Sequence, residues 1–379
     1  MDLLPVYSLM DIELVKGQGS TVWDCTGRAY LDLYGGHAVI SIGHSHPHYV
    51  AAIAGQVAEL GFYSNSVRIR IQEEVAEQLG RISGYPSYRF FMVNSGAEAN
   101  ENAMKLASFA TGRSRIVAFD KAFHGRTSLA VAATDNPKIV APVNRTSNIV
   151  FAPLNDAAAL EAILAEGDVA AVIIEGMQGV AGVRMPTDDF LRDVERLCVS
   201  YGALMILDEV QSGSGRSGTY FAHQHSGVTP QLITVAKGIG NGFPVGGLLV
   251  HPDIAVTDGM LGTTFGGNHL ACAAMKAVMD VIEQDDLMAA AERLGAHLVE
   301  RCKDLPFVQE VRGRGLMIGI QLDRPVGAVR TALVKRHGIL TGNASQPATL
   351  RVLPPLNVTQ ADLDRFVEAL IDVYTTEAP

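Results

Sequence analysis

The sequence contains few of the residues that build disulfide frameworks or metal clusters. Its four cysteines, at positions 25, 198, 272 and 302 of 379, lack the close spacing of a zinc site. We therefore expect no disulfide framework, and we expect these cysteines to be buried as small hydrophobic side chains.

Long apolar runs and an excess of positive charge are also absent. No segment has the length of a membrane span, and the start lacks the basic region and apolar run of a signal peptide. The net charge of −10 argues against nucleic acid or an anionic membrane as a partner. These absences predict a cytoplasmic protein, although the charge does not select a substrate.

The composition is that of a large globular protein, with 48% hydrophobic and 18% charged residues. The pattern of apolar segments predicts an α/β fold with two domains. We expect an N-terminal arm and part of a small domain in residues 1–40, and a large domain with a mostly parallel, helix-covered sheet in residues 41–270. A smaller α+β domain should follow in residues 271–379.

Three apolar segments of the large domain each stop at a charged residue. Residues 169–174 stop at Glu175, residues 204–207 at Asp208, and residues 232–236 at Lys237. Strands that are apolar on both faces belong inside a covered parallel sheet, and ligands bind beyond the carboxyl ends of such strands. Asp208 and Lys237 should therefore face one crevice.

Burying the charge of a lysine or an aspartate is unfavourable unless a partner or a chemical modification compensates for it. An unpaired buried ammonium has a lowered pKa or has lost its charge as an imine, and a buried carboxylate needs a cation. Pyridoxal phosphate satisfies both, because its aldehyde forms a Schiff base with Lys237 and its protonated ring nitrogen pairs with Asp208. The alternative is a structural ion pair between the two residues.

A phosphate-binding site is predicted after the strand at residues 89–93. Ser95 and Glu98 have the spacing of a capping box, which marks the start of a helix. The amides of Gly96 and Ala97 would point out of this helix start, where the helix dipole favours an anion.

Two further segments have open interpretations. Phe123 follows a predicted strand and can stack on a flat ring, while Arg126 can grip a carboxylate; otherwise they belong to a capped loop. Thr263 and Thr264 either bind phosphate or cap the next helix.

Three histidines at alternate positions, 44, 46 and 48, suggest a metal site at first sight. Pro47 between them suits the first turn of a helix, and apolar residues at helical spacing follow. We interpret these histidines as loop and helix-start residues, and we predict no metal.

With these segments placed, the sequence resembles class III, fold-type I pyridoxal-phosphate aminotransferases, and among them the acetylornithine and succinylornithine aminotransferases. The resemblance runs from about Asp11 to the C-terminal helix. Its specificity comes from the joint occurrence, in this order, of the motifs at residues 43–47, 94–100, 123–127, 208–211, 236–237 and 263–268.

The resemblance implies a role for each residue of the cofactor site. Lys237 would bond covalently to the cofactor and Asp208 would hold the ring nitrogen. The other implied cofactor contacts are Gln211 at the ring hydroxyl, Phe123 on the ring, Gly96 and Ala97 at the phosphate, and Thr264 at the phosphate of the neighbouring subunit. The last contact implies a homodimer.

The resemblance also implies the substrates. Arg126, with Thr263, would contact the acylated amino acid, and Arg351 would receive a carboxylate of 2-oxoglutarate or glutamate. The implied reaction is ping-pong transfer of the terminal amino group of N-acetyl- or N-succinyl-L-ornithine to 2-oxoglutarate, in arginine biosynthesis. The alternatives are another ω-amino-acid aminotransferase of the 4-aminobutyrate or ornithine type, an aminomutase, or a cofactor-binding regulatory module without turnover.

One position departs from the family pattern. Ornithine-type members have a glutamate where Val180 stands, and that glutamate pairs with the arginine equivalent to Arg351 while the donor is bound. Because an unpaired buried charge is costly, we hypothesise that the donor itself carries an extra carboxylate, as N-succinylornithine does. His37 is a second candidate for a specificity residue.

Overall fold

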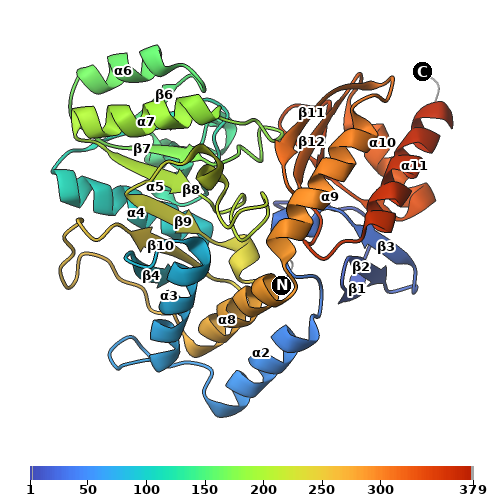
Figure 1. Ribbon diagram of the computed structural model, residues 1–379, viewed down its shortest axis with the longest axis horizontal. Coiled ribbons are helices and arrows are strands. Elements are labelled where there is room, and N and C mark those ends of the chain that lie inside the picture. The colour runs from blue at the N-terminus through green and yellow to red at the C-terminus, as the bar shows by residue number, and fades with distance from the viewer. Residues whose placement is uncertain (2, 377–379) are drawn as a thin grey trace.

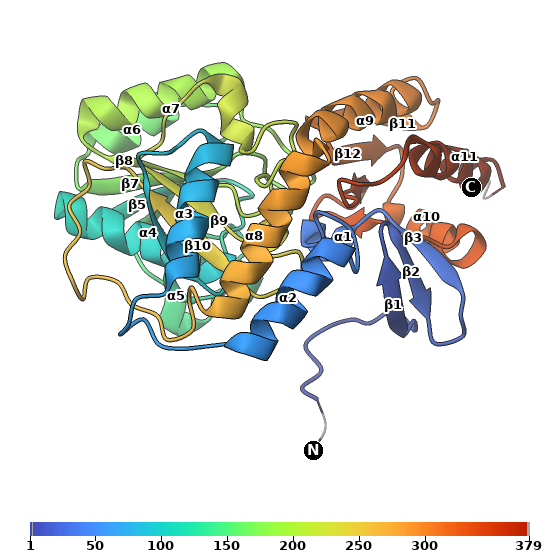
Figure 2. The same ribbon diagram turned by 60° about the horizontal axis from the view of Figure 1, so that its bottom comes forward.

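The computed structural model describes residue 1 and residues 3–376, which form three sheets and the helices that cover them (Figure 1). A 7-stranded sheet lies on one side of the molecule, and two 4-stranded sheets lie on the other (Figure 2). The predicted fold class is confirmed, because the large sheet is mostly parallel and the smaller sheets form an α+β part.

The 7-stranded sheet contains the three apolar segments that end in charge. Its strands lie in the order β4 (Arg89–Val93), β10 (Gly246–Val250), β9 (Leu232–Val235), β8 (Leu204–Asp208), β7 (Val169–Glu175), β5 (Arg115–Phe119) and β6 (Ile149–Ala152). The five strands from β9 to β6 are parallel, and β10 is antiparallel to both of its neighbours. The carboxyl ends of β7 and β8 are therefore neighbours, with Glu175 beside Asp208 in the register.

Both faces of this sheet are buried, which explains its continuous apolar strands. In β7, Ala171 and Ile173 pack into one core while Val172 and Ile174 pack into another. Helices α4 (Gly96–Thr111) and α5 (Ser128–Ala132) cover the first face. The opposite face is covered by α3 (Arg70–Ser83), α6 (Ala157–Ala165), α7 (Asp188–Tyr201) and α8 (His269–Gln284).

The two smaller sheets bring the ends of the chain together. One contains β1 (Leu14–Gln18), β2 (Thr21–Asp24), β3 (Ala29–Asp32) and β13 (Ile339–Leu340); the other contains β11 (Val308–Arg314), β12 (Met317–Leu322), β15 (Thr349–Val352) and β14 (Gly342–Asn343). Strand β3 pairs in parallel with β13, so the N-terminal segment shares a sheet with the C-terminal part. The domain boundaries at residues 40 and 270 stay predictions.

The helices of the C-terminal part share one hydrophobic core with these sheets. They are α9 (Leu287–Cys302), α10 (Val326–Ala332) and α11 (Gln360–Thr376). In both views α9 and α11 lie beside the smaller sheets, away from the 7-stranded sheet (Figures 1 and 2).

Helix α2 (Pro47–Glu59) begins at the predicted proline but has no buried residue. Val57 is 59% exposed and Val50 is 49% exposed. The apolar face predicted for this helix is therefore present, yet within one chain it is largely uncovered.

Cys25 corrects the prediction of four buried cysteines. Three are buried, but Cys25 is exposed, because it lies in the tight turn between β2 and β3. No cysteine of the described residues is in a disulfide. Among the same residues, every helix is too short or too polar to cross a bilayer.

Candidate active site

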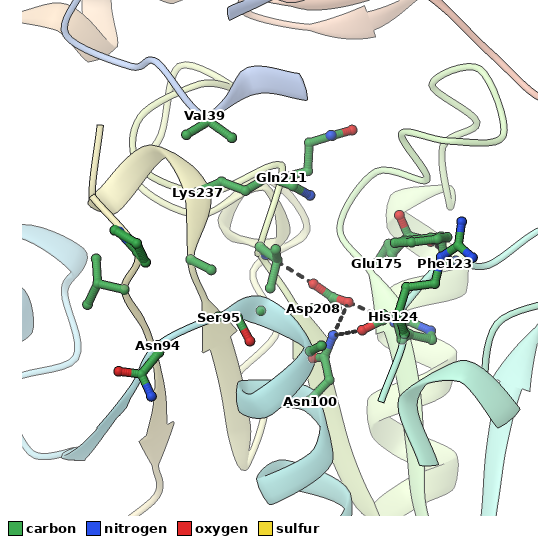
Figure 3. A pocket seen from close by; sticks show the side chains of 18 of the residues that line it. Val39, Asn94, Ser95, Asn100, Phe123, His124, Glu175, Asp208, Gln211 and Lys237 are labelled. Atoms are coloured by element: carbon green, nitrogen blue, oxygen red, sulfur yellow. Dashed lines mark hydrogen bonds and ion pairs between the residues drawn. The ribbon is translucent and has the colours of Figure 1, made fainter. Parts of the chain in front are cut away.

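The carboxyl ends of β7 and β8 and the loop after β9 open onto one cavity of about 380 Å³. Glu175, Asp208 and Lys237 all line it, as predicted from the three segments that end in charge. Figure 3 shows Asp208 near the centre of the cavity, with Lys237 on one side and Glu175 on the other.

Asp208 ends β8, is 4% exposed and has three hydrogen-bond donors around its carboxylate. Oδ2 accepts hydrogen bonds from Asn100 Nδ2 and His124 Nδ1, both at 2.7 Å, and Oδ1 accepts one from the amide of Val210 at 3.0 Å. These bonds fix the orientation of the carboxylate. Oδ1 retains the capacity to accept a further donor from the cavity.

Asn100 and His124 are functional neighbours that the sequence analysis did not identify. Asn100 lies on α4 and accepts a bond from Thr234 Oγ1 at 2.7 Å, which orients its amide toward Asp208. His124 is buried, and its Nε2 has no partner among the described residues. The signal for His124 was its place directly after Phe123 at the end of a strand, but only the fold shows that it reaches Asp208.

Lys237 does not end a strand, because β9 stops at Val235. Lys237 instead begins a short 3-10 helix, Lys237–Ile239, with a φ of 48°. This left-handed conformation is strained for a residue with a side chain, and such strain is concentrated at functional sites. Burial lowers the pKa of the Lys237 ammonium, although Asp208 and Glu175 act in the opposite direction.

Glu175 is the third charged residue of the cavity and is only 7% exposed. Its two carboxylate oxygens accept hydrogen bonds from the amides of Phe123 at 2.9 Å and Gly179 at 3.2 Å. Burial raises the pKa of Glu175 to about 7, and the nearby charge of Asp208 adds to that effect. Its bonds connect the loop that carries Phe123 to the loop that follows β7.

The start of α4, where the sequence predicts an anion site, is a capped helix N-terminus. Ser95 Oγ caps the helix by accepting the amide of Glu98 at 3.2 Å, but the Glu98 side chain reaches the amide of Asn94 instead of the Ser95 amide. The amides of Gly96 and Ala97 therefore lie in a capped first turn, where they have no intrahelical acceptor. A Cβ atom on Gly96 would lie 2.6 Å from Val210 Cγ1, so only glycine fits there.

Gln211 and Phe123 also line the cavity, on different sides of it. Gln211 Nε2 donates to the carbonyl of His37 at 3.0 Å, and its Oε1 is buried without a partner. Figure 3 shows Phe123 beside Glu175, away from Gln211.

Two of the three predicted substrate-binding residues are cations. Arg126 is exposed and lines the cavity. Arg351, on β15, is only 3% exposed, and it donates to the carbonyls of Asn343 at 2.6 Å and Gly179 at 3.1 Å. Among the described residues no carboxylate pairs with Arg351, and burial lowers the pKa of its guanidinium.

Val180 separates the first cavity from a second one. It lines both, as does Phe123, and the second cavity of about 680 Å³ has Lys121, Lys138 and Arg184 in its wall. Arg351 donates to the carbonyl of Gly179, and the side chain of the next residue, Val180, is apolar.

The two threonines are not brought into the cavity of their own chain. Thr264 is exposed, and Thr263 lines a separate pocket that also contains Asn65. Thr263 Oγ1 accepts a hydrogen bond from Asn94 Nδ2 at 3.4 Å, so it contacts the rim of the first cavity indirectly.

The three alternating histidines bind three different aspartates. His44 pairs with Asp32 at 2.8 Å and His48 with Asp280 at 3.0 Å, while His46 lies 3.9 Å from Asp285. Among the described residues no group of three potential ligands is placed to hold a metal ion.

The residues around the cavity fit pyridoxal phosphate, the cofactor implied by the resemblance. A lysine of lowered pKa, an aspartate with a free acceptor position and an uncrowded helix start match its aldehyde, ring nitrogen and phosphate. Gln211 also lines this cavity, although its Oε1 is buried against Gly179.

Comparison with known proteins identifies the family of this chain. The model of the family "Aminotransferase class-III" matches residues 5–374. An acetylornithine aminotransferase of Bacillus subtilis (strain 168) is 41% identical over 374 residues, covering 97% of this chain and 96% of that protein.

Solved structures agree with the sequence relatives. The ornithine aminotransferase of Toxoplasma gondii ME49 has a TM-score of 0.91 at 28% identity, over 98% of this chain and 93% of that one. The acetylornithine aminotransferase of Elizabethkingia anophelis has a TM-score of 0.85 at 29% identity, with coverages of 98% and 94%. Because the family model spans nearly the whole chain, the chain belongs to the class III aminotransferases.

Proposed function

We propose that this chain transfers the terminal amino group of an N-acylated ornithine to 2-oxoglutarate, in arginine biosynthesis in the cytoplasm. As a class III aminotransferase, it is a pyridoxal-phosphate-dependent transaminase. The observation that carries the proposal is the meeting of Lys237, Asp208 and the start of α4 around one cavity. Relatives named as acetylornithine aminotransferases, at 39–41% identity, support the choice of donor.

Lys237 and Asp208 would carry the chemistry. When bound, pyridoxal phosphate supplies a carbonyl carbon that takes the donor amine and a ring that accepts electrons from the substrate carbon. Lys237 Nζ, with its lowered pKa, would attach the resting cofactor and then move the proton between the substrate carbon and the cofactor. Asp208 Oδ1 would hold the proton on the ring nitrogen.

The remaining cofactor contacts would fix the ring in place. The amides of Gly96 and Ala97 would bind the phosphate, Phe123 would stack on the ring, and Gln211 would approach the ring hydroxyl. The capped helix start and the absence of a side chain at Gly96 support the phosphate position.

A second copy of the chain would complete the site. Thr264 would bind the phosphate in the neighbouring subunit, which accounts for its exposed position outside the cavity of its own chain. The surface near it supports a homodimer. The Phe265 side chain is 59% exposed, and its ring contacts that of Phe62, with centroids 5.2 Å apart. Val57, which precedes Phe62 in the sequence on helix α2, is also exposed.

Arg126, with Thr263, would bind the acylated amino acid, and Arg351 would bind a carboxylate of 2-oxoglutarate or glutamate. The identity of the acyl group would depend on Val180. With valine at that position, the partners of Arg351 among the described residues are two carbonyls and the Tyr34 ring, 5.8 Å away, so no carboxylate would mask its charge in either half-reaction. A donor with an additional carboxylate would neutralise the buried guanidinium, which N-acetylornithine cannot do.

A panel of amino donors tests the proposal. We expect kcat/KM for N-succinyl-L-ornithine to exceed that for N-acetyl-L-ornithine by at least about tenfold, the low end of the penalty for leaving a buried polar group unpaired. Val180→Glu should abolish this preference by pairing with Arg351. Val180→Ala is the matched control, because it removes the same side chain without adding charge, and it should keep the preference.

The panel also includes ornithine and 4-aminobutyrate. Equal kcat/KM values for the two acylated donors, or a preference for N-acetylornithine, would refute the assignment of the succinyl group. A preference for ornithine or 4-aminobutyrate would refute the acylated donor, and activity without any keto acid would indicate a mutase.

A further inference from the structure

The segment between β3 and Ile40 has a backbone conformation that calls for an explanation. The four residues labelled α1 (Gly35–Ala38) have φ angles of 54°, 54°, 68° and 63°, so they form one left-handed turn. Two of these residues, His37 and Ala38, carry side chains that disfavour positive φ. Such a turn persists only where neighbouring contacts hold it, and such turns occur at functional sites.

Asp32 holds the beginning of this turn. Its Oδ1 accepts the amides of Gly35 at 2.8 Å and Tyr34 at 3.0 Å, and its Oδ2 pairs with His44 Nε2 at 2.8 Å. Asp32 is 5% exposed, so these bonds are largely shielded from water. Tyr34 Oη and His37 Nδ1 also hydrogen-bond across the turn.

The end of the turn contacts Gln211, which lines the cofactor cavity. The carbonyl of His37 accepts Gln211 Nε2 at 3.0 Å, and this is the only side-chain hydrogen bond of Gln211 among the described residues. Gln211 Oε1 lies against Gly179, where a Cβ atom would be 1.6 Å away. The orientation of this amide is thus set by the turn on one side and by Gly179 on the other.

We propose that Asp32 is a positioning residue, which acts through the left-handed turn Gly35–Ala38 to fix the Gln211 amide beside the cofactor. The inference rests on the proposed function, because it takes Gln211 as the residue that approaches the ring hydroxyl. Asp32 itself does not line the cavity. With one Nε2 hydrogen bonded to His37, the amide of Gln211 is held in one orientation, and that orientation sets which of its remaining groups a neighbouring hydroxyl meets.

The test is a titration of cofactor-free protein with pyridoxal phosphate, with two readouts. These are the dissociation constant and the pH midpoint of the visible absorption of the bound cofactor. Asp32→Ala should raise the dissociation constant about fivefold, the effect of losing one hydrogen bond. It should also shift the midpoint in the same direction as Gln211→Ala. The double variant should have the midpoint of Gln211→Ala alone.

A second variant covers the case in which Asp32→Ala fails to fold. Gly36→Ala opposes the left-handed turn directly, since Gly36 has a φ of 54° and a methyl group added there would have no other atom within 4 Å. It should shift the midpoint in the same direction as Asp32→Ala.

The chain offers a matched control for each variant. Asp24, 9% exposed, accepts the amides of Thr26 at 2.9 Å and Arg28 at 3.0 Å in a turn away from the cavity. Gly27 in that turn has a φ of 86° and equally open surroundings. Asp24→Ala and Gly27→Ala should lower stability while leaving both readouts unchanged.

Four results would overturn the proposal. They are an unchanged midpoint and dissociation constant in folded Asp32→Ala, an unchanged midpoint in Gly36→Ala, additive shifts in the double variant, or equal shifts in the controls. If wild-type protein fails to bind pyridoxal phosphate, the proposed function has failed instead, which separates the two outcomes.

Discussion

Replacing Lys237 with alanine should reduce kcat by about ten-thousand-fold, the upper range of what a positioned acid–base group contributes. The lysine amine would both hold the cofactor carbon and move the substrate proton, so no neighbouring side chain can take over both tasks. The phosphate and ring contacts remain, and the variant should still bind pyridoxal phosphate. Single-turnover kinetics and equilibrium dialysis measure the two effects separately.

Adding a small amine to the buffer tests whether the missing amino group causes the loss of activity. Methylamine can enter the space left by the Lys237 side chain, and it should restore part of the activity of the alanine variant. Lys138→Ala is the control, because Lys138 lies in the wall of the second cavity and should be dispensable. Wild-type turnover in Lys237→Ala would show that another group performs the proton transfer.

Replacing Asp208 with asparagine should reduce kcat by about a hundred- to a thousand-fold, the usual effect of removing one preorganised electrostatic contact. If the asparagine oxygen keeps the bonds from Asn100 and His124, its Nδ2 must occupy the place of Oδ1. That nitrogen would then face the amide of Val210, which also donates. The ring nitrogen would thus lose both its acceptor and the negative charge that keeps it protonated.

The expected signature of Asp208→Asn is a large loss in kcat with a smaller change in KM, because the charge matters most in the transition state. Asp120→Asn is a matched control, since Asp120 pairs with Arg184 at 3.2 Å on the wall of the second cavity. It changes the net charge by the same amount and should leave kcat within about twofold, as expected for a surface substitution away from the site. A wild-type kcat in Asp208→Asn would contradict the role of this carboxylate.

The sequence predicted the buried parallel strands well, because strands covered on both faces are apolar throughout. It did not predict β10, whose two glycines at residues 246 and 247 hide the strand pattern. These glycines have a packing reason. A Cβ atom at Gly246 would lie 2.7 Å from the carbonyl oxygen of Ser95, and one at Gly247 would collide with the Phe90 ring. These close neighbours leave no room for side chains at the two positions, so the sequence lacks the apolar residues by which a strand is recognised.

The sequence predicted those cavity residues whose type is rare in a buried position and therefore needs a ligand or partner. A lysine and an aspartate at the ends of apolar strands need a common ligand, and the structure brings Lys237 and Asp208 to one cavity. His124 and Asn100 were not predictable, because histidine and asparagine occur for many reasons and their contact with Asp208 depends on the packing of α4. Thr264 and the apolar face of α2 are exposed in the single chain, and the proposed homodimer would give both of them partners.

The left-handed turn was not predictable for a different reason. The residues Gly35 and Gly36 suggest a turn, but nothing in the sequence requires His37 and Ala38 to adopt positive φ as well. The hydrogen bonds that Asp32 accepts and that Gln211 donates help to hold that conformation, and these two residues lie far apart in the sequence.

The central claim is that Lys237 carries pyridoxal phosphate opposite Asp208. Borohydride reduction of the purified enzyme, followed by peptide mass analysis, tests it most directly. We expect one pyridoxyl group per chain on the peptide that contains Lys237, and loss of that label when an N-acylornithine donor is added before the reductant. A label on another lysine, or an unlabelled protein after incubation with the cofactor, would contradict the claim.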